Sequence, residues 1–166
     1  MTRTCPVAAF LLALPFTPSL AAAQVTSAGA VHQAFAATTS ASATYSNPSG
    51  AFQPLPGSSL NITLRLPSML VVTFSARGSV AGPATGAAVP IVFIKCQIDN
   101  APCEPDQNSV EFLYPQGCCD SRSFTWIVHA ATKGAHTIQI LWGMGNPTSA
   151  VVSNRTLAVE AAQLVR

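Results

Sequence analysis

The residues best suited to chemistry in this sequence are its cysteines, of which there are five. Cys5 falls in an amino-terminal stretch that we expect to be cleaved, so an even number remains. In an exported chain, an even number of cysteines indicates two disulfide bonds. A bond between neighbours 118 and 119 would close a strained ring, so we expect the other two cysteines each to bond one member of that pair. The four predicted disulfide residues are Cys96, Cys103, Cys118 and Cys119.

The same four side chains have two other uses, as zinc ligands or as a thiol nucleophile. Four cysteines match the ligand number of a structural zinc site. Their spacing is not that of a zinc knuckle, however, and oxidation is favoured over both uses outside the cytoplasm. We therefore expect disulfides rather than metal or thiol chemistry.

Most of the acidic residues gather around these cysteines. Five of the six acids lie between residues 99 and 120. Carboxylate oxygens are the ligands that Ca²⁺ prefers, so these loops form the candidate calcium site. The sequence has no EF-hand or other spaced calcium motif, and the alternative is that the loops simply carry the few available charges. The five acids are Asp99, Glu104, Asp106, Glu111 and Asp120.

The sequence offers no catalytic constellation around these residues. The G-x-S-x-G turn that exposes the nucleophile in many serine hydrolases does not occur in it. His32, His129 and His136 lie in the amino-terminal segment or on predicted strand faces, where ordinary surface positions explain them. We expect a protein that is not an enzyme, and a small hydrolase is the weaker hypothesis.

Carbohydrate binding usually needs exposed aromatic side chains, because sugar rings stack on their faces. Trp126 and Trp142 are in phase with apolar neighbours, so we assign both to the core. Phe112 and Tyr114, beside the cysteine loops, are the predicted exposed aromatics. Together with the acidic loops 99–120 they define the main alternative function, carbohydrate binding.

The amino terminus predicts export. Arg3 supplies a positive charge, Val7–Phe16 is an apolar run, and Ala21–Ala23 are small residues before Gln24. That is the order of a secretory signal peptide, and the run is much shorter than the roughly 20 residues needed to span a bilayer. We expect cleavage after residue 23 and a secreted or periplasmic mature chain without a membrane span.

Charged residues are scarce, at 8% of the chain against about 25% in typical domains. Without Arg3, seven of the eight basic residues remain to face six acidic ones. This balance is too even for a basic surface that binds phosphate backbones, which argues against nucleic acid as a partner. A surface of uncharged polar residues resists association poorly, so it favours self-association or a surface glycan as partner.

Alternation of apolar and polar residues predicts strands as the elements that position these side chains. No stretch shows a helical repeat. The predicted fold is all-β, a single jelly-roll-like β-sandwich of about eight antiparallel strands. We expect a signal peptide at 1–23, a loose low-complexity arm at 24–59 with one strand near 31–35, and the sandwich at 60–166. Strands are predicted at 60–66, 69–77, 89–99, 110–114, 124–130, 136–142 and 154–159.

Several of these strands resemble secreted bacterial jelly-roll domains grouped with the C1q/TNF-like sandwiches. The run Gly134–Ile140 before a closing strand is similar to the late strands of such domains. The resemblance spans about residues 60–160 and implies a binding or assembly domain, often trimeric, without catalysis. It assigns no functional residue. The segments that carry it are Leu70–Ala76, Val92–Asn100, Phe124–Val128, Gly134–Ile140 and Asn154–Leu157. The predicted function is therefore adhesion, binding or assembly.

Overall fold

The computed structural model describes residues 32–45, 49–81, 90–105, 109–113, 120–145 and 149–164. The predicted signal peptide at 1–23 lies outside the described residues. Every regular element described is a β-strand. The strands are β1 (His32–Thr39), β2 (Ala43–Tyr45), β3 (Gln53–Leu64), β4 (Ser68–Ala81), β5 (Ile91–Ile98), β6 (Ala101–Pro102), β7 (Val110–Leu113), β8 (Asp120–Ala131), β9 (Gly134–Gly145) and β10 (Ser149–Gln163). The described residues contain no helix long and apolar enough to cross a membrane.

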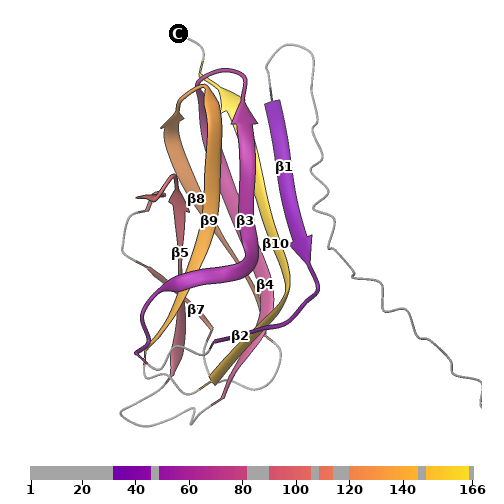
Figure 1. The fold of residues 1–166 in the computed structure, drawn as a ribbon, viewed down its shortest axis with the longest axis vertical. Coiled ribbons are helices and arrows are strands. Elements are labelled where there is room, and N and C mark those ends of the chain that lie inside the picture. Colours follow the sequence, from indigo (N-terminus) through magenta and orange to yellow (C-terminus); the bar gives the residue numbers. More distant parts are fainter. Residues whose placement is uncertain are drawn as a thin grey trace, which may run out of the picture.

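The strands form two five-stranded antiparallel sheets that pack as a sandwich (Figure 1). One sheet has the order β1-β10-β4-β8, with β2 also paired to β10. The other has the order β3-β9-β5-β6, with β7 also paired to β5. The predicted all-β sandwich is confirmed, and the described residues form ten strands where about eight were expected.

The core lies between the sheets, and period-two alternation places residues in it. Leu70, Val72 and Phe74 of β4 are fully buried, as the alternation predicted. On the facing sheet the pattern of β9 is equally regular, and the side chains of Ile138 and Ile140 are inaccessible. Apolar burial on this scale is the main force that holds the two sheets together. Both tryptophans belong to this core, with Trp126 2% and Trp142 0% exposed.

The segment predicted to be a loose arm is part of the sandwich, which corrects the expected boundary at residue 60. His32–Thr39 pairs along its whole length with β10, and β3 begins at Gln53 rather than Leu60. The buried side chain of Gln33 joins the two sheets at this edge. Its Nε2 donates to the Thr63 carbonyl, and its Oε1 accepts from the Arg65 amide.

Candidate functional site

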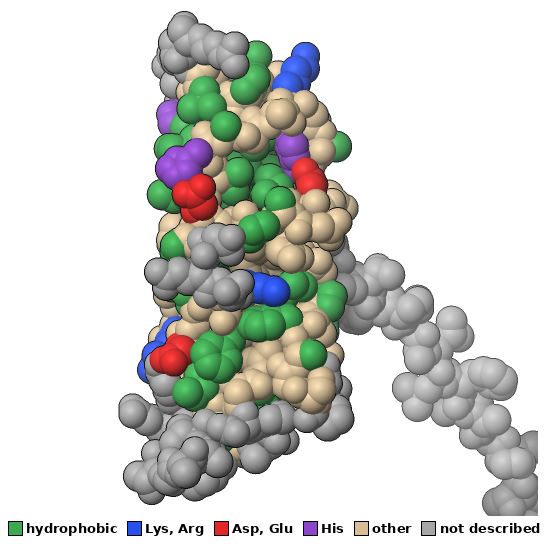
Figure 2. Space-filling model, turned by 90° about the vertical axis from the view of Figure 1, so that its left-hand side faces the viewer, with side chains coloured by type: hydrophobic (Ala, Val, Ile, Leu, Met, Phe, Trp, Pro, Cys, Tyr) green, Lys and Arg blue, Asp and Glu red, His purple; other side chains and the backbone are tan. Residues whose placement is uncertain are grey.

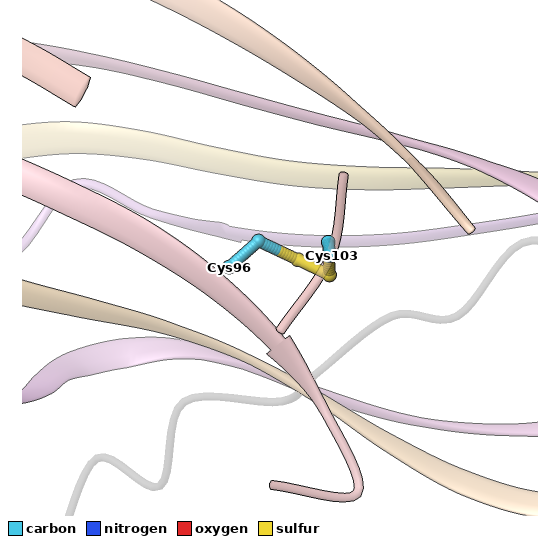
Figure 3. The surroundings of a disulfide bond; sticks show 2 residues. All are labelled: Cys96 and Cys103. Carbon is cyan, nitrogen blue, oxygen red and sulfur yellow. A yellow bond between two sulfur atoms is a disulfide. The ribbon is translucent and has the colours of Figure 1, made fainter. Parts of the chain in front are cut away.

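The cysteines pair differently from the prediction. Cys96 bonds to Cys103, with their Cα atoms 5.3 Å apart (Figure 3). The expectation that each would bond Cys118 or Cys119 is therefore wrong. Cys118 and Cys119 lie outside the described residues. The disulfide closes a short hairpin between β5 and β6 rather than tying that hairpin to the loop before β8.

Backbone geometry at the hairpin explains this pairing. Asp99 and Asn100 both have positive φ angles, of 50° and 69°. Two such residues form the type I′ turn that suits a two-residue hairpin, where Asp and Asn are favoured. The turn sets Ile98 opposite Ala101 and Gln97 opposite Pro102. The next step along the ladder brings Cys96 opposite Cys103, and the Cys103 amide donates to the Cys96 carbonyl at 3.1 Å. The Asp-Asn dipeptide was the sequence signal for this bond.

The same hairpin bridges the two sheets at one edge of the sandwich. Directly after Cys103, Glu104 makes a backbone pair with Ile127 of β8. The Glu104 amide donates to the Ile127 carbonyl at 2.9 Å, and the Ile127 amide donates back at 2.8 Å. The disulfide therefore anchors to β5 a segment that also pairs with β8 of the opposite sheet.

Asp99, predicted as a calcium ligand, binds protein groups instead. Its Oδ1 accepts from the Thr137 amide at 2.8 Å, and its Oδ2 lies 2.7 Å from Nδ1 of His136. The Thr137 amide and the His136 side chain lower the pKa of the Asp99 carboxyl. Burial opposes a raised pKa at His136, but hydrogen bonds to Asp99 and Thr132 prevail and raise the pKa of that imidazole.

This histidine and carboxylate resemble part of a catalytic triad, but the second ring nitrogen rules out that role. Nε2 of His136 lies 2.8 Å from the carbonyl oxygen of Thr132. A carboxylate and a carbonyl both only accept hydrogen bonds, so each ring nitrogen must donate. A base needs a free lone pair facing the substrate. His136 has none when both ring nitrogens donate to these oxygens, and in that protonated form it is a structural cation.

The other described acids lie apart from Asp99, and two of them have their own basic partners. Oε2 of Glu104 lies 3.0 Å from Nε2 of His129, and Oδ2 of Asp120 lies 2.6 Å from Nε of Arg122. Glu111 lies opposite Phe93 on the neighbouring strand, and Asp106 is outside the described residues. Figure 2 shows histidine and acidic side chains next to each other on a face with few other charges. Within the described residues, no three His, Cys, Asp or Glu side chains gather as a metal site.

The predicted aromatic platform does not form. Phe112 is 2% exposed and packs against Phe74, with ring centroids 5.5 Å apart, so its prediction as an exposed stacking residue is wrong. Tyr114 lies outside the described residues. A cavity of about 230 Å³ beside the disulfide is lined by Lys95, Trp126 and neighbouring residues, with no carboxylate among its described walls. A second cavity, of about 310 Å³, is lined by Asp99 with Gln97, Asn100, Thr137 and Gln139, and its described walls include no aromatic side chain on which a sugar ring could stack.

An aromatic patch occurs elsewhere, on the outer face of the sheet formed by β3, β9 and β5. The inward residues of β5 are buried, so Ile91, Phe93 and Lys95 point outward, and each is half-buried. Leu141 of β9 lies opposite Lys95. Phe52, just before β3, is 36% exposed. We call these five residues the Phe52/Phe93 patch. Sequence reasoning missed it because Phe52 falls in the predicted arm.

Two glycines of β9 let the aromatic rings lie close to the sheet. A Cβ on Gly143 would lie 3.3 Å from the Phe52 ring, and one on Gly145 would lie 3.1 Å from the Phe93 ring. Lys95 places its ammonium group 4.4 Å from the centroid of the Phe52 ring, a cation–π contact. The patch is thus a largely apolar surface on a sheet face that contains one cation, Lys95, and is bordered by the exposed Glu111 opposite Phe93.

No protein-family model and no curated protein matches the chain. Among solved structures, a chain in the structure of infectious bursal disease virus, Gt strain, is similar with a TM-score of 0.50 and 13% identity. The similarity covers 92% of this chain and 38% of that one. The VP2 protein of the same virus, in derived T=1 particles, has a TM-score of 0.46 and 11% identity over 93% of this chain and 41% of that chain. This chain thus spans well under half the length of both, and the first likeness concerns the fold alone.

Proposed function

We propose that the chain is an exported, non-catalytic β-sandwich that assembles with further copies of itself through the Phe52/Phe93 patch. The observation that carries the proposal is the patch itself. Its aromatic and aliphatic side chains are partly exposed on a sheet face, in a chain with few charged residues. The cores of protein interfaces are enriched in aromatic residues.

Two further observations support it. A chain in the structure of infectious bursal disease virus, Gt strain, shares this fold, and its place in a virus favours a role in assembly. The Cys96–Cys103 disulfide suits a protein that works in an oxidising compartment, as the predicted signal peptide requires. The trimer implied by the C1q/TNF-like resemblance stays a prediction, and the oligomer's mass will test it.

The test is size-exclusion chromatography with light scattering on residues 24–166 over a range of concentrations. We expect an oligomer whose mass rises with concentration to a fixed multiple of the monomer. The double variant Phe52→Ser/Phe93→Ser should remain monomeric. Ile127→Ser is the matched control, because Ile127 is 37% exposed but lies on the opposite sheet, and it should assemble like the unmodified chain.

Two results would contradict the proposal. One is a monomer at every concentration, and the other is equal loss of assembly in the patch and control variants. Thermal unfolding of each variant shows that it is folded. Because both serine substitutions in the patch act at half-exposed side chains, we expect melting temperatures close to that of the unmodified protein.

A further inference from the structure

Arg155 of β10 is a buried cation without an anionic partner in the described part of the chain. Its side chain is 3% exposed, and burial lowers its pKa. Nη1 donates to the Val152 carbonyl at 2.6 Å, whereas Nε has no hydrogen-bond partner among the described residues. Burying a guanidinium without a compensating charge is energetically costly. Such a group is expected to recruit an anion.

A bulge in β10 gives this arginine an unusual neighbourhood. The register between β10 and β4 shifts between Ser153 and Thr156, and Asn154 has a positive φ of 47°. In a regular strand successive side chains point to opposite faces. The bulge breaks that alternation, so three consecutive residues, Asn154, Arg155 and Thr156, line one surface cavity of about 460 Å³.

The other walls of this cavity come from the end of β1. They are Thr38, Thr39 and Ser40, all with hydroxyl groups. Behind them, β3 also bulges, and Gly57 has a φ of +68°. A Cβ on Gly57 would lie 3.5 Å from Nη2 of Arg155, so the missing side chain leaves room beside the guanidinium. The next residue, Ser58, is buried, and its hydroxyl also has no partner among the described residues.

We propose that this cavity binds a small oxyanion, a phosphate, sulfate or carboxylate group, through the guanidinium of Arg155 and the surrounding hydroxyls. The described lining contains one cation, hydroxyls and an amide, and no acid. Guanidinium N–H groups form paired, charge-assisted hydrogen bonds to such oxygens. The site is independent of the Phe52/Phe93 patch, which lies on the other sheet.

The test is thermal unfolding of residues 24–166 with inorganic phosphate, sulfate or acetate, against sodium chloride at the same pH and ionic strength. A ligand that binds only the folded state raises the melting temperature with its concentration. We expect a saturable rise with phosphate or sulfate that chloride does not produce. Acetate distinguishes the ligand classes, because a response to acetate that exceeds those to phosphate and sulfate assigns the site to carboxylates. Equal responses to all salts, chloride included, would overturn the proposal.

Variants locate the binding at Arg155. Arg155→Met should lose the phosphate response, and in sodium chloride without an added oxyanion it should melt no lower than the unmodified protein because the uncompensated charge is gone. Arg65→Met is the control, because the Arg65 side chain is exposed outside the cavity, and it should keep the full response. If Arg155→Met does not fold, the phosphate response of Arg155→Lys is measured instead. It keeps the charge but lacks the planar set of donors, so an affinity at least tenfold weaker is expected. An unchanged response in the folded Arg155 variant would refute the site.

Discussion

His136 and Asp99 form a contact of 2.7 Å between Nδ1 and Oδ2, and this contact fastens the β5–β6 turn to β9. The side chain of His136 is 9% exposed, and its other nitrogen meets the carbonyl of Thr132 in the β8–β9 turn. One protonated ring therefore holds two turns together. When the ring loses its proton, one of the two hydrogen bonds must be lost, because the neutral ring has a single N–H.

This arrangement predicts how stability depends on pH. His136 has a raised pKa in the folded protein, so its contribution is complete below the ordinary histidine pKa and is lost as the pH rises through the raised value. Asp99 has a lowered pKa, so its contribution is complete above the ordinary aspartate pKa and is lost as the pH falls through the lowered value. The free energy of unfolding should therefore be highest between the two ordinary values.

Urea unfolding at a series of pH values measures this dependence. His136→Gln should flatten the decline on the alkaline side. His129→Gln is the control, because the His129 side chain is 65% exposed, and it should keep that decline. An alkaline decline of equal size in all three proteins would show that the contact between His136 and Asp99 does not cause it.

The disulfide should be found by peptide mapping of the unreduced protein as a linked peptide containing Cys96 and Cys103. Replacing both with alanine should lower the free energy of unfolding by about 2–3 kcal/mol, the entropy of closing so short a loop in the unfolded chain. Cys118→Ser/Cys119→Ser is the control and should leave the linked peptide intact. A linked peptide that joins either residue to 118 or 119 would contradict the pairing.

Gly78 of β4 marks a close approach between the sheets. A Cβ at this position would lie 2.5 Å from Cδ1 of Leu113 and 2.8 Å from the Val151 carbonyl oxygen. Gly78→Ala should therefore destabilise the protein by about 1–3 kcal/mol through overpacking. Gly145→Ala is the comparison, because a Cβ there meets only the Phe93 ring, which can move. Equal urea midpoints for the two variants would argue against the close packing at β4.

Deleting the amino-terminal strands tests whether they belong to the fold. A chain of residues 60–166 lacks β1, β2 and the first half of β3, which exposes the edge of β10 and the core beneath it. We expect no cooperative thermal transition for this chain by circular dichroism. Residues 24–166 should unfold in one sharp transition. A 60–166 chain as stable as 24–166 would show that the amino-terminal strands are dispensable.

The strands of the core could be predicted from the sequence because their alternation is strong. Leu70, Val72 and Phe74 repeat at period two with β-branched residues between them, and such a pattern buries one face whatever the partner strand is. The strand expected near 31–35 is confirmed as part of β1, but its full length and its place in the sandwich could not be predicted in the same way. Its residues are mostly alanine and threonine, and its inward Gln33 looks like a surface residue until its two partners on the opposite sheet are known.

The candidate sites were harder to predict because they depend on contacts between distant segments. The cysteine pairing could have been derived from the Asp99–Asn100 turn, which fixes the ladder locally. The Phe52/Phe93 patch could not, because Phe52 reaches the face of β9 only after the first part of β3 has joined its sheet. Arg155 gave no signal at all, since its burial follows from bulges in two strands that no sequence pattern marked.

The pairing of β1 with β10 also governs when this protein can fold. The first described strand lies beside the last one in the sheet, although more than a hundred residues separate them in the chain. A polypeptide leaves the ribosome or a translocation channel amino terminus first. β1 therefore has no β10 to pair with until β10 has emerged. Contacts this distant in sequence also slow folding. This sheet can therefore be completed only after β10 has been synthesised.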